Sequence, residues 1–229
     1  METPKLVLEA LESELVVDHV IVPGDQHPDP DIAERCETNG VRLFGLEADA
    51  FTKLSDARTP QPALAVVESP SLDVDERFTG DGMYLVLVDV SDPGNVGTLI
   101  RTAEATGSAG VIVTSQTADV LSPKVVRASA GSMLRMPLGE VELDELPATL
   151  ERLGVRSLAT AMEGVNYAEV KVDRAKGLAI ILGSEAHGLD PLIAASADDI
   201  VSIPMHGKVE SLNVATTGAV LAFAMASQR

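Results

Sequence analysis

The segment Val201–Met225 reads V-S-I-P-M-H-G-K-V-E-S-L-N-V-A-T-T-G-A-V-L-A-F-A-M. Its first residues, through Ile203-Pro204-Met205, have the apolar character of a buried strand that is ending. A polar loop follows, and Ser211-Leu212-Asn213 opens an apolar helix rich in small residues. Core packing does not require the polar groups of this loop, so the segment predicts a strand, a ligand-binding loop and a helix. Ser211 or Asn213 can also serve simply as the N-cap of the helix.

The same alternation extends back along the chain to about residue 84. Further apolar runs predict strands, and the stretches between them predict helices. The strand ranges are 84–89, 110–113, 157–160, 178–182 and 200–203, and the helix ranges are 96–106, 124–129, 143–153, 191–195 and 213–225. Continuous apolar strands between helices indicate an α/β fold with a parallel sheet covered on both faces. Such sheets bind ligands beyond the carboxyl ends of their strands.

The stretch 69–82, S-P-S-L-D-V-D-E-R-F-T-G-D-G, interrupts this rhythm with Pro, Gly, Ser and charge. It is interpreted as a linker, which divides the chain into a small module, 1–68, and a larger domain, 83–229. The small module is also α/β. Its expected strands are 16–22, 41–45 and 64–67, and its expected helices are 31–38 and 50–54.

Composition limits the possible functions of this 229-residue chain, whose hydrophobic content of 45% is typical of a globular protein. The single cysteine, Cys36, excludes an intramolecular disulfide and a multi-cysteine zinc site, so no metal is expected. The amino terminus is charged, and no apolar run reaches the roughly 18 residues of a membrane span. We therefore expect a cytoplasmic protein with no membrane partner.

The formal net charge of −18 disfavours nucleic-acid binding, which usually depends on a basic face. Residues 1–78 hold 17 acidic and 6 basic side chains, and residues 79–229 hold 18 and 11. One stretch, 91–139, is locally basic. Its cations are candidate RNA contacts: Arg101, Lys124, Arg127 and Arg135.

Two further polar loops follow predicted strands. The first, 89–97, reads D-V-S-D-P-G-N-V-G; Pro93-Gly94 makes a turn, Asn95 can cap the next helix, and Arg101 lies about two turns into it. The second, 183–189, reads G-S-E-A-H-G-L, in which two glycines allow close approach to a ligand. Ordinary turns explain each loop equally well by itself. Neither G-x-G-x-x-G nor G-x-x-x-x-G-K-[ST] occurs in the chain.

Taken together, D-P-G-N-V-G…R-T-A, G-S-E-A-H-G-L and I-P-M-H-G-K-V-E-S-L-N-V resemble the three signature motifs of the SpoU-type (TrmH-like) RNA ribose 2′-O-methyltransferases of the SPOUT superfamily. R-A-S-A-G-S at 127–132 also resembles a family element, and the similarity spans about 84–225. It implies a deep trefoil knot, S-adenosylmethionine (SAM) as cofactor, rRNA or tRNA as substrate, and a homodimer through the knotted domain. Residues 1–68 resemble the small RNA substrate-binding domain of some relatives.

The resemblance also assigns residue roles. Arg101 matches the functional arginine, although a guanidinium with a pKa above about 12 is a poor base. Clamping a phosphate and stabilising alkoxide charge suit Arg101 better. Asn95 is expected to orient Arg101 or the substrate, and Glu185 to position Arg101. Ser211 and Asn213 are expected to hold the cofactor loop and the ribose hydroxyl, so these five residues form the expected catalytic set. The expected cofactor contacts are Leu182, Gly183, Ile203, Met205, Ser211, Leu212 and Asn213.

Several alternatives stay open. His187 and His206 are better bases by pKa, but these positions vary in the family pattern. The small residues of the last helix serve core packing, a dimer contact or both; they are Ala215, Gly218, Ala219, Ala222 and Ala226. The protein could also be a catalytically silent knotted RNA-binding protein, or a knotted tRNA base methyltransferase. The sequence does not name the RNA.

Overall fold

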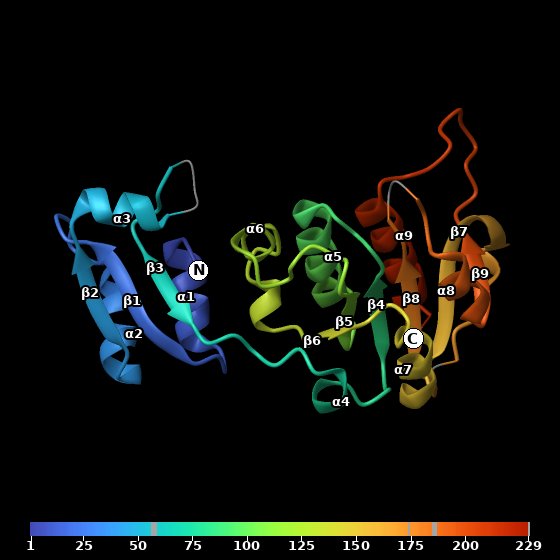
Figure 1. Ribbon diagram of the computed structural model, residues 1–229, viewed down its shortest axis with the longest axis horizontal. Helices are drawn as coiled ribbons and strands as arrows, with labels where there is room; N and C mark the ends of the chain where they lie inside the picture. The colour runs from blue at the N-terminus through green and yellow to red at the C-terminus, as the bar shows by residue number, and fades with distance from the viewer. Residues whose placement is uncertain (56–58, 174, 185–186, 229) are drawn as a thin grey trace. The chain divides into compact units, whose positions relative to one another are not determined.

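The computed structural model describes residues 1–55, 59–173, 175–184 and 187–228. The chain divides into two compact units, Met1–Pro70 and Ser71–Arg229 (Figure 1). No described helix is long and apolar enough to cross a bilayer.

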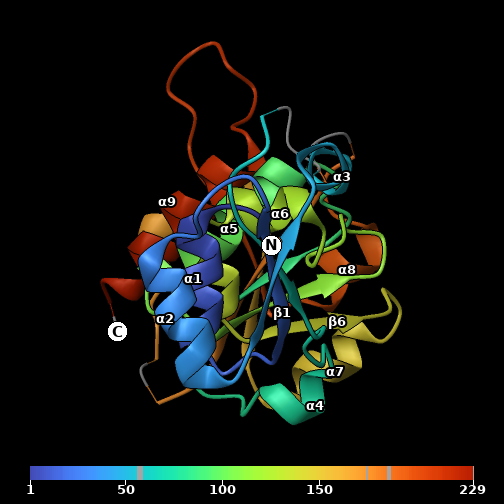
Figure 2. The same ribbon diagram turned by 90° about the vertical axis from the view of Figure 1, so that its left-hand side faces the viewer.

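The first unit contains a three-stranded sheet in the order β2-β1-β3, in which β1 runs parallel to β2 and antiparallel to β3. Helices α1 and α2 pack side by side on this sheet (Figure 2). Between helices and sheet lies a core that includes Val7, Val20, Ile32 and Cys36. Burial raises the pKa of the Cys36 thiol. The elements are α1 (Pro4–Glu12), β1 (Val17–Pro23), α2 (Pro30–Asn39), β2 (Arg42–Leu46), α3 (Ala48–Leu54) and β3 (Leu64–Val67).

The second unit contains a six-stranded sheet in the order β6-β5-β4-β8-β7-β9. Every pair of neighbouring strands in it is parallel, as the apolar runs predicted. The strands are β4 (Met83–Leu87), β5 (Gly110–Thr114), β6 (Leu138–Val141), β7 (Arg156–Asn166), β8 (Leu178–Leu182) and β9 (Asp199–Ser202). The helices are α4 (Val74–Arg77), α5 (Pro93–Ala105), α6 (Pro123–Ala128), η1 (Ser132–Leu134), α7 (Leu146–Leu153), η2 (Tyr167–Glu169), α8 (Pro191–Ser196) and α9 (Val214–Ala226).

Helices cover both faces of this sheet because strand side chains alternate between them. Tyr84 and Val86 of β4 lie in a core cluster with residues of α4, α7 and α8. Helices α5 and α9 contact each other and the neighbouring strands β4 and β8 from the other face. The buried run predicted at 84–89 is therefore a central strand enclosed on both sides.

The expected linker 69–82 is wrong over most of its length. Its residues from Ser71 onward belong to the second unit, where α4 packs on β6. Val74 and Phe78 are buried in the core, and the Leu72 carbonyl accepts a hydrogen bond from the Glu140 N–H at 2.8 Å. Two apolar side chains among many charges were enough to anchor a segment whose composition resembles a linker.

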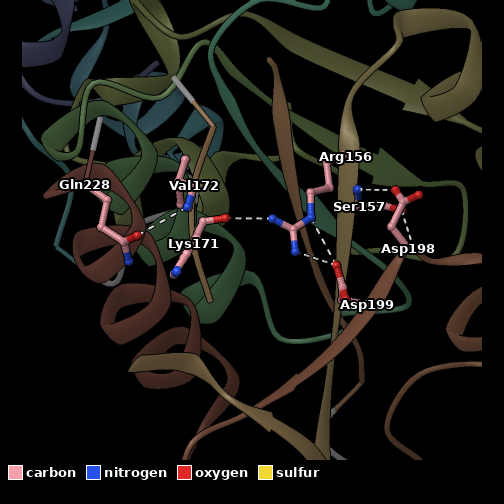
Figure 3. Close-up of polar contacts among 7 residues, drawn as sticks. All are labelled: Arg156, Ser157, Lys171, Val172, Asp198, Asp199 and Gln228. Atoms are coloured by element: carbon pink, nitrogen blue, oxygen red, sulfur yellow. Dashed lines mark hydrogen bonds and ion pairs between the residues drawn. The ribbon is translucent and has the colours of Figure 1, made fainter. Parts of the chain in front are cut away.

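At the amino ends of β7 and β9, a polar network joins four segments of the chain (Figure 3). The Arg156 guanidinium donates to Asp199 Oδ2 at 2.6 Å and to the Lys171 carbonyl at 2.7 Å. Asp198 Oδ2 accepts from the Ser157 N–H at 2.8 Å, and this bond lowers the pKa of the Asp198 carboxyl. Gln228 Oε1, after the end of α9, accepts from the Val172 N–H at 3.2 Å. The network fixes the edge of the sheet opposite the polar loops.

Candidate active site

The three polar loops follow β4, β8 and β9 at the carboxyl edge of the sheet, as predicted. Strands β4 and β8 are neighbours, and the Val88 N–H donates to the Leu182 carbonyl at 2.8 Å, which brings the first two loops together. The third loop joins them through one side-chain contact. Asn213 Nδ2 donates to Asn95 Oδ1 at 3.1 Å across a sequence separation of 118 residues.

The caps of α5 and α9 involve the same two segments of the chain. Asp92, not Asn95, caps α5: its Oδ1 accepts from the Asn95 N–H at 2.8 Å, so the expectation that Asn95 caps this helix is wrong. Helix α5 starts at Pro93, whose fixed φ and missing N–H suit the first turn. Asn213 does cap α9, because its Oδ1 accepts from the Ala215 N–H at 2.9 Å. Its Nδ2 is left for Asn95.

Two glycines let α5 lie close to its neighbours. A Cβ on Gly97 would stand 2.4 Å from Ala128 Cβ and 2.8 Å from the Ser129 nitrogen, so α5 and α6 meet with no room for a side chain. A Cβ on Gly218 would stand 2.3 Å from Leu99 Cδ2, which shows the same closeness between α5 and α9. The helix that carries Arg101 is thus fixed from two sides.

Arg101 is exposed on α5, four residues after Gly97, and therefore on the same side of the helix as α6. Its guanidinium makes no hydrogen bond or ion pair with the described residues. Its predicted partner, Glu185, lies outside the described residues, so that pairing stays a prediction.

The cations of the basic stretch 91–139 differ in exposure and in pairing. Lys124 is exposed in the first turn of α6, and Arg127 is half-buried at the end of that helix. Arg135 forms a two-pronged ion pair with Glu104 of α5, whose second contact, Nη2 to Oε2, measures 3.1 Å. This pairing lowers the pKa of the Glu104 carboxyl. Arg135 is therefore engaged within the chain, whereas Lys124 extends into solvent.

The expected cofactor residues lie at the end of β8 and in the segment between β9 and α9. Leu182 is buried, and a Cβ on Gly183 would stand 2.6 Å from backbone atoms of Gly188 and Leu189, so the second loop folds tightly onto its own start. In the third loop, the side chains of Ile203, Met205 and Leu212 are half-buried, and that of Ser211 is exposed. Residues 205–212 make no backbone hydrogen bond to any described residue. Their N–H and C=O groups are available to a ligand.

Asp89 is a further residue at this edge, which the motifs did not single out. It follows the apolar run of β4, and it has a φ of 56° and a hydrogen bond to Thr114. A carboxylate at the end of the apolar run 84–89 was its signal in the sequence.

The sequence profile of the SpoU rRNA methylase family matches residues 82–223, which include all three loops. The chain belongs to the SpoU rRNA methylase family. A Bacillus subtilis SpoU relative named 23S rRNA (guanosine(2553)-2′-O)-methyltransferase RlmP is 33% identical over 224 residues, covering 97% of this chain and 86% of its own. A Streptomyces viridochromogenes relative, 23S rRNA (uridine(2479)-2′-O)-methyltransferase, is 32% identical over 203 residues, covering 86% of this chain and 71% of its own.

Among solved SpoU structures, that of the methyltransferase AviRb from Streptomyces viridochromogenes, in complex with the cofactor AdoMet, has a TM-score of 0.88 and 26% identity. The match covers 100% of this chain and 89% of AviRb. An AdoMet-bound rRNA methyltransferase from Sinorhizobium meliloti matches with a TM-score of 0.86 and 27% identity, over 98% of this chain and 85% of the other. The SpoU resemblance of the three motifs is thus confirmed.

Across the described part of the chain, no three His, Cys, Asp or Glu side chains come close enough to hold a metal ion. His187 and His206 are both exposed, and neither side chain bonds to a described residue. Their candidacy as bases stays a prediction.

Proposed function

We propose that the protein transfers a methyl group from SAM to a ribose 2′-hydroxyl of RNA, with rRNA the first candidate substrate. The observation that carries this proposal is the meeting of the loops at the Asn95–Asn213 contact of 3.1 Å, beyond the carboxyl ends of β4, β8 and β9. Open parallel sheets bind ligands at this edge. The relatives named above act on 23S rRNA by their names.

The residues at this edge fit SAM. Free backbone groups in residues 205–212 can read an adenine, while Ile203, Met205 and Leu212 offer half-buried apolar surface. Leu182 and Gly183 would form the opposite wall, and Ser211 and Asn213 would hold the loop. When bound, SAM supplies an electrophilic methyl group.

The chain's own contribution is chiefly orientation, which can lower a barrier by roughly 7–11 kcal/mol. Arg101 is exposed near α6, and it would bind the phosphate beside the target ribose and stabilise the developing alkoxide. Asn95, held by Asn213, would orient the substrate or Arg101. Glu185 is the expected partner of Arg101.

We also infer the trefoil knot and the homodimer that the family resemblance implies. The small residues Ala215, Gly218 and Ala222 are buried within the chain, so they serve its core. Phe223 of the same helix is 54% exposed, and Met162 on β7 is 69% exposed. These apolar side chains suit a contact between two copies. Phe223→Glu should convert a dimer into a monomer in sedimentation velocity; an unchanged dimer would place the contact elsewhere.

We propose that the first unit also touches the RNA. On the sheet face opposite α1 and α2, Phe44 is 44% exposed, with the Arg42 guanidinium 5.5 Å from its ring centroid and His19 edge-on at 5.5 Å. Aromatic rings and guanidinium planes on an open sheet stack unpaired bases. Stacking also suits an acidic unit, because it does not depend on phosphate neutralisation. A protein that methylates rRNA would work in the cytoplasm.

The test is incubation of the purified protein with methyl-labelled SAM and unmodified large-subunit rRNA transcript, followed by nucleoside analysis. A labelled ribose 2′-oxygen supports the proposal, and Arg101→Ala should then remove most of the label. A labelled base would favour the tRNA base-methyltransferase alternative. SAM binding without label, on rRNA and on tRNA, would favour the catalytically silent alternative.

A further inference from the structure

Asp89 has a backbone conformation that side chains rarely adopt. Its φ of 56° lies in the left-handed region, shared among the described non-glycine residues only by Thr3 and Ala130. Aspartate tolerates this region better than most residues, but the conformation persists only where the surroundings hold it. Asp89 stands two residues after β4, at the start of the loop that leads to Asn95.

A buried hydroxyl group, that of Thr114, holds Asp89 in this conformation. The Asp89 N–H donates to Thr114 Oγ1 at 3.1 Å, and Thr114 Oγ1 donates to Asp89 Oδ1 at 3.1 Å, so the two residues form a closed pair. Thr114, at the end of β5, is 1% exposed, and this pair gives its hydroxyl both a donor and an acceptor. Thr117 Oγ1 lies 3.4 Å from the same hydroxyl and donates to the Leu87 carbonyl at 3.0 Å.

The turn at Asp89 determines the path of the first loop. It sends Val90 into the core, where its carbonyl accepts from the Ala118 N–H at 3.0 Å. The chain then reaches Asp92, which caps α5 and presents Asn95 to Asn213. We propose that Asp89 is a positioning residue for methyl transfer, which acts through the location of Asn95. The activity part of this inference rests on the proposed function.

Four variants separate the geometry from the charge. Asp89→Asn keeps an acceptor and tolerance of the left-handed turn, and Thr114→Ser keeps the hydroxyl. Both should retain kcat within about threefold on the large-subunit rRNA transcript. Asp89→Ala and Thr114→Val remove the pair, and each should lower kcat about tenfold or more, with SAM Kd within about threefold of wild type. Because the two act as one unit, the double variant should lose little more than either single one.

A buried-residue control excludes a general loss of stability. Leu150→Ala creates a cavity in the core beside α7, on the sheet face opposite α5 and α9. It should lower the melting temperature but leave kcat unchanged at temperatures below its unfolding transition. The inference is overturned if Asp89→Ala keeps wild-type kcat. It is also overturned if Leu150→Ala, at a melting temperature equal to that of Asp89→Ala, loses as much activity as Asp89→Ala does.

A second readout does not depend on methyl transfer. The Asn213 side-chain amide gives a ¹⁵N NMR signal that reports its bond to Asn95. This signal should shift in Asp89→Ala and Thr114→Val but stay in place in Asp89→Asn. If wild type methylates no RNA, the proposed function fails, and this signal still decides the positioning role: an unshifted signal in Asp89→Ala overturns it.

Discussion

Asn213 performs two tasks with one amide group. Its oxygen caps α9, and its nitrogen holds Asn95, which belongs to a loop 118 residues earlier. One side chain therefore contributes both to the stability of a helix and to the assembly of the site. The two contributions can be separated, because they use different atoms.

Substitution of Asn213 by serine should separate them. Serine is as good an N-cap as asparagine but is too short to reach Asn95, whereas Asn213→Ala removes both hydrogen bonds. In urea unfolding, Asn213→Ser should keep nearly wild-type stability, and Asn213→Ala should lose about 1 kcal/mol. Both should lower kcat for methyl transfer about tenfold, the equivalent of one hydrogen bond. If serine restores activity along with stability, the bond to Asn95 is dispensable.

At the scale of elements, the site depends on how closely helices approach one another. Gly97 stands at the crossing of α5 and α6, where a methyl group would lie 2.8 Å from the Ser129 nitrogen. Backbone atoms cannot rotate away as the end of a side chain can. The crossing therefore fixes where α5 places Arg101.

Gly97→Ala should destabilise the second unit by about 1–3 kcal/mol from overpacking, even though alanine favours helix by about 1 kcal/mol. Gly207→Ala is the control, because a Cβ there meets nothing within 4 Å. Denaturant unfolding of the two variants measures their free energies of unfolding. Equal stability of Gly97→Ala and Gly207→Ala would show that α6 moves aside without cost.

The polar network at the amino ends of β7 and β9 should make the stability of the second unit depend on pH. The Ser157 N–H bond lowers the pKa of Asp198 in the folded state, so this carboxylate adds stability above its ordinary pKa and loses it as pH falls through the lowered value. Asp198→Asn should therefore be less stable than wild type at pH 7, and the difference should shrink below about pH 4. Thermal unfolding across pH measures this, and a constant difference would exclude the charge as its cause.

On the whole molecule, the formal charge of −18 makes the few cations near the site decisive for RNA binding. Lys124→Glu combined with Arg127→Glu should weaken RNA binding. The slope of the logarithm of the binding constant against the logarithm of salt concentration should fall in magnitude by about one unit for each phosphate that is no longer neutralised. SAM affinity should stay nearly constant. The control is Lys171→Glu with Lys176→Glu, an equal charge change at the amino ends of the strands. Equal weakening by both pairs would mean a general charge effect.

How much of the fold could be predicted from the sequence depends on how strong a pattern each element leaves in it. The central strands, the parallel sheet and the edge that holds the loops followed from apolar periodicity and turn chemistry, since burial on both faces leaves a distinct pattern. Helix α1 and strand β6 were missed, because a short amphipathic helix and a four-residue edge strand leave little periodicity. The segment with Val74 and Phe78 was mistaken for a linker for the same reason.

The site was predictable as a set of loops but not as a geometry. Sequence order placed Asn95 and Asn213 in different loops, and only the fold brings their amides to 3.1 Å. The ion pair of Arg135 with Glu104 and the turn at Asp89 depend on contacts across 31 and 25 residues, which periodicity does not report.

Helix α9 has one more consequence, which concerns the time at which the protein becomes active. Gly218 packs against Leu99 and Leu182, and Asn213 meets Asn95, so the last helix completes both the core of the second unit and the site. During translation these residues emerge after all the strands they contact. The contacts of α9 can therefore form only after this helix has been synthesised. The site is therefore complete only once synthesis has passed α9, and methyl transfer should begin only after that point.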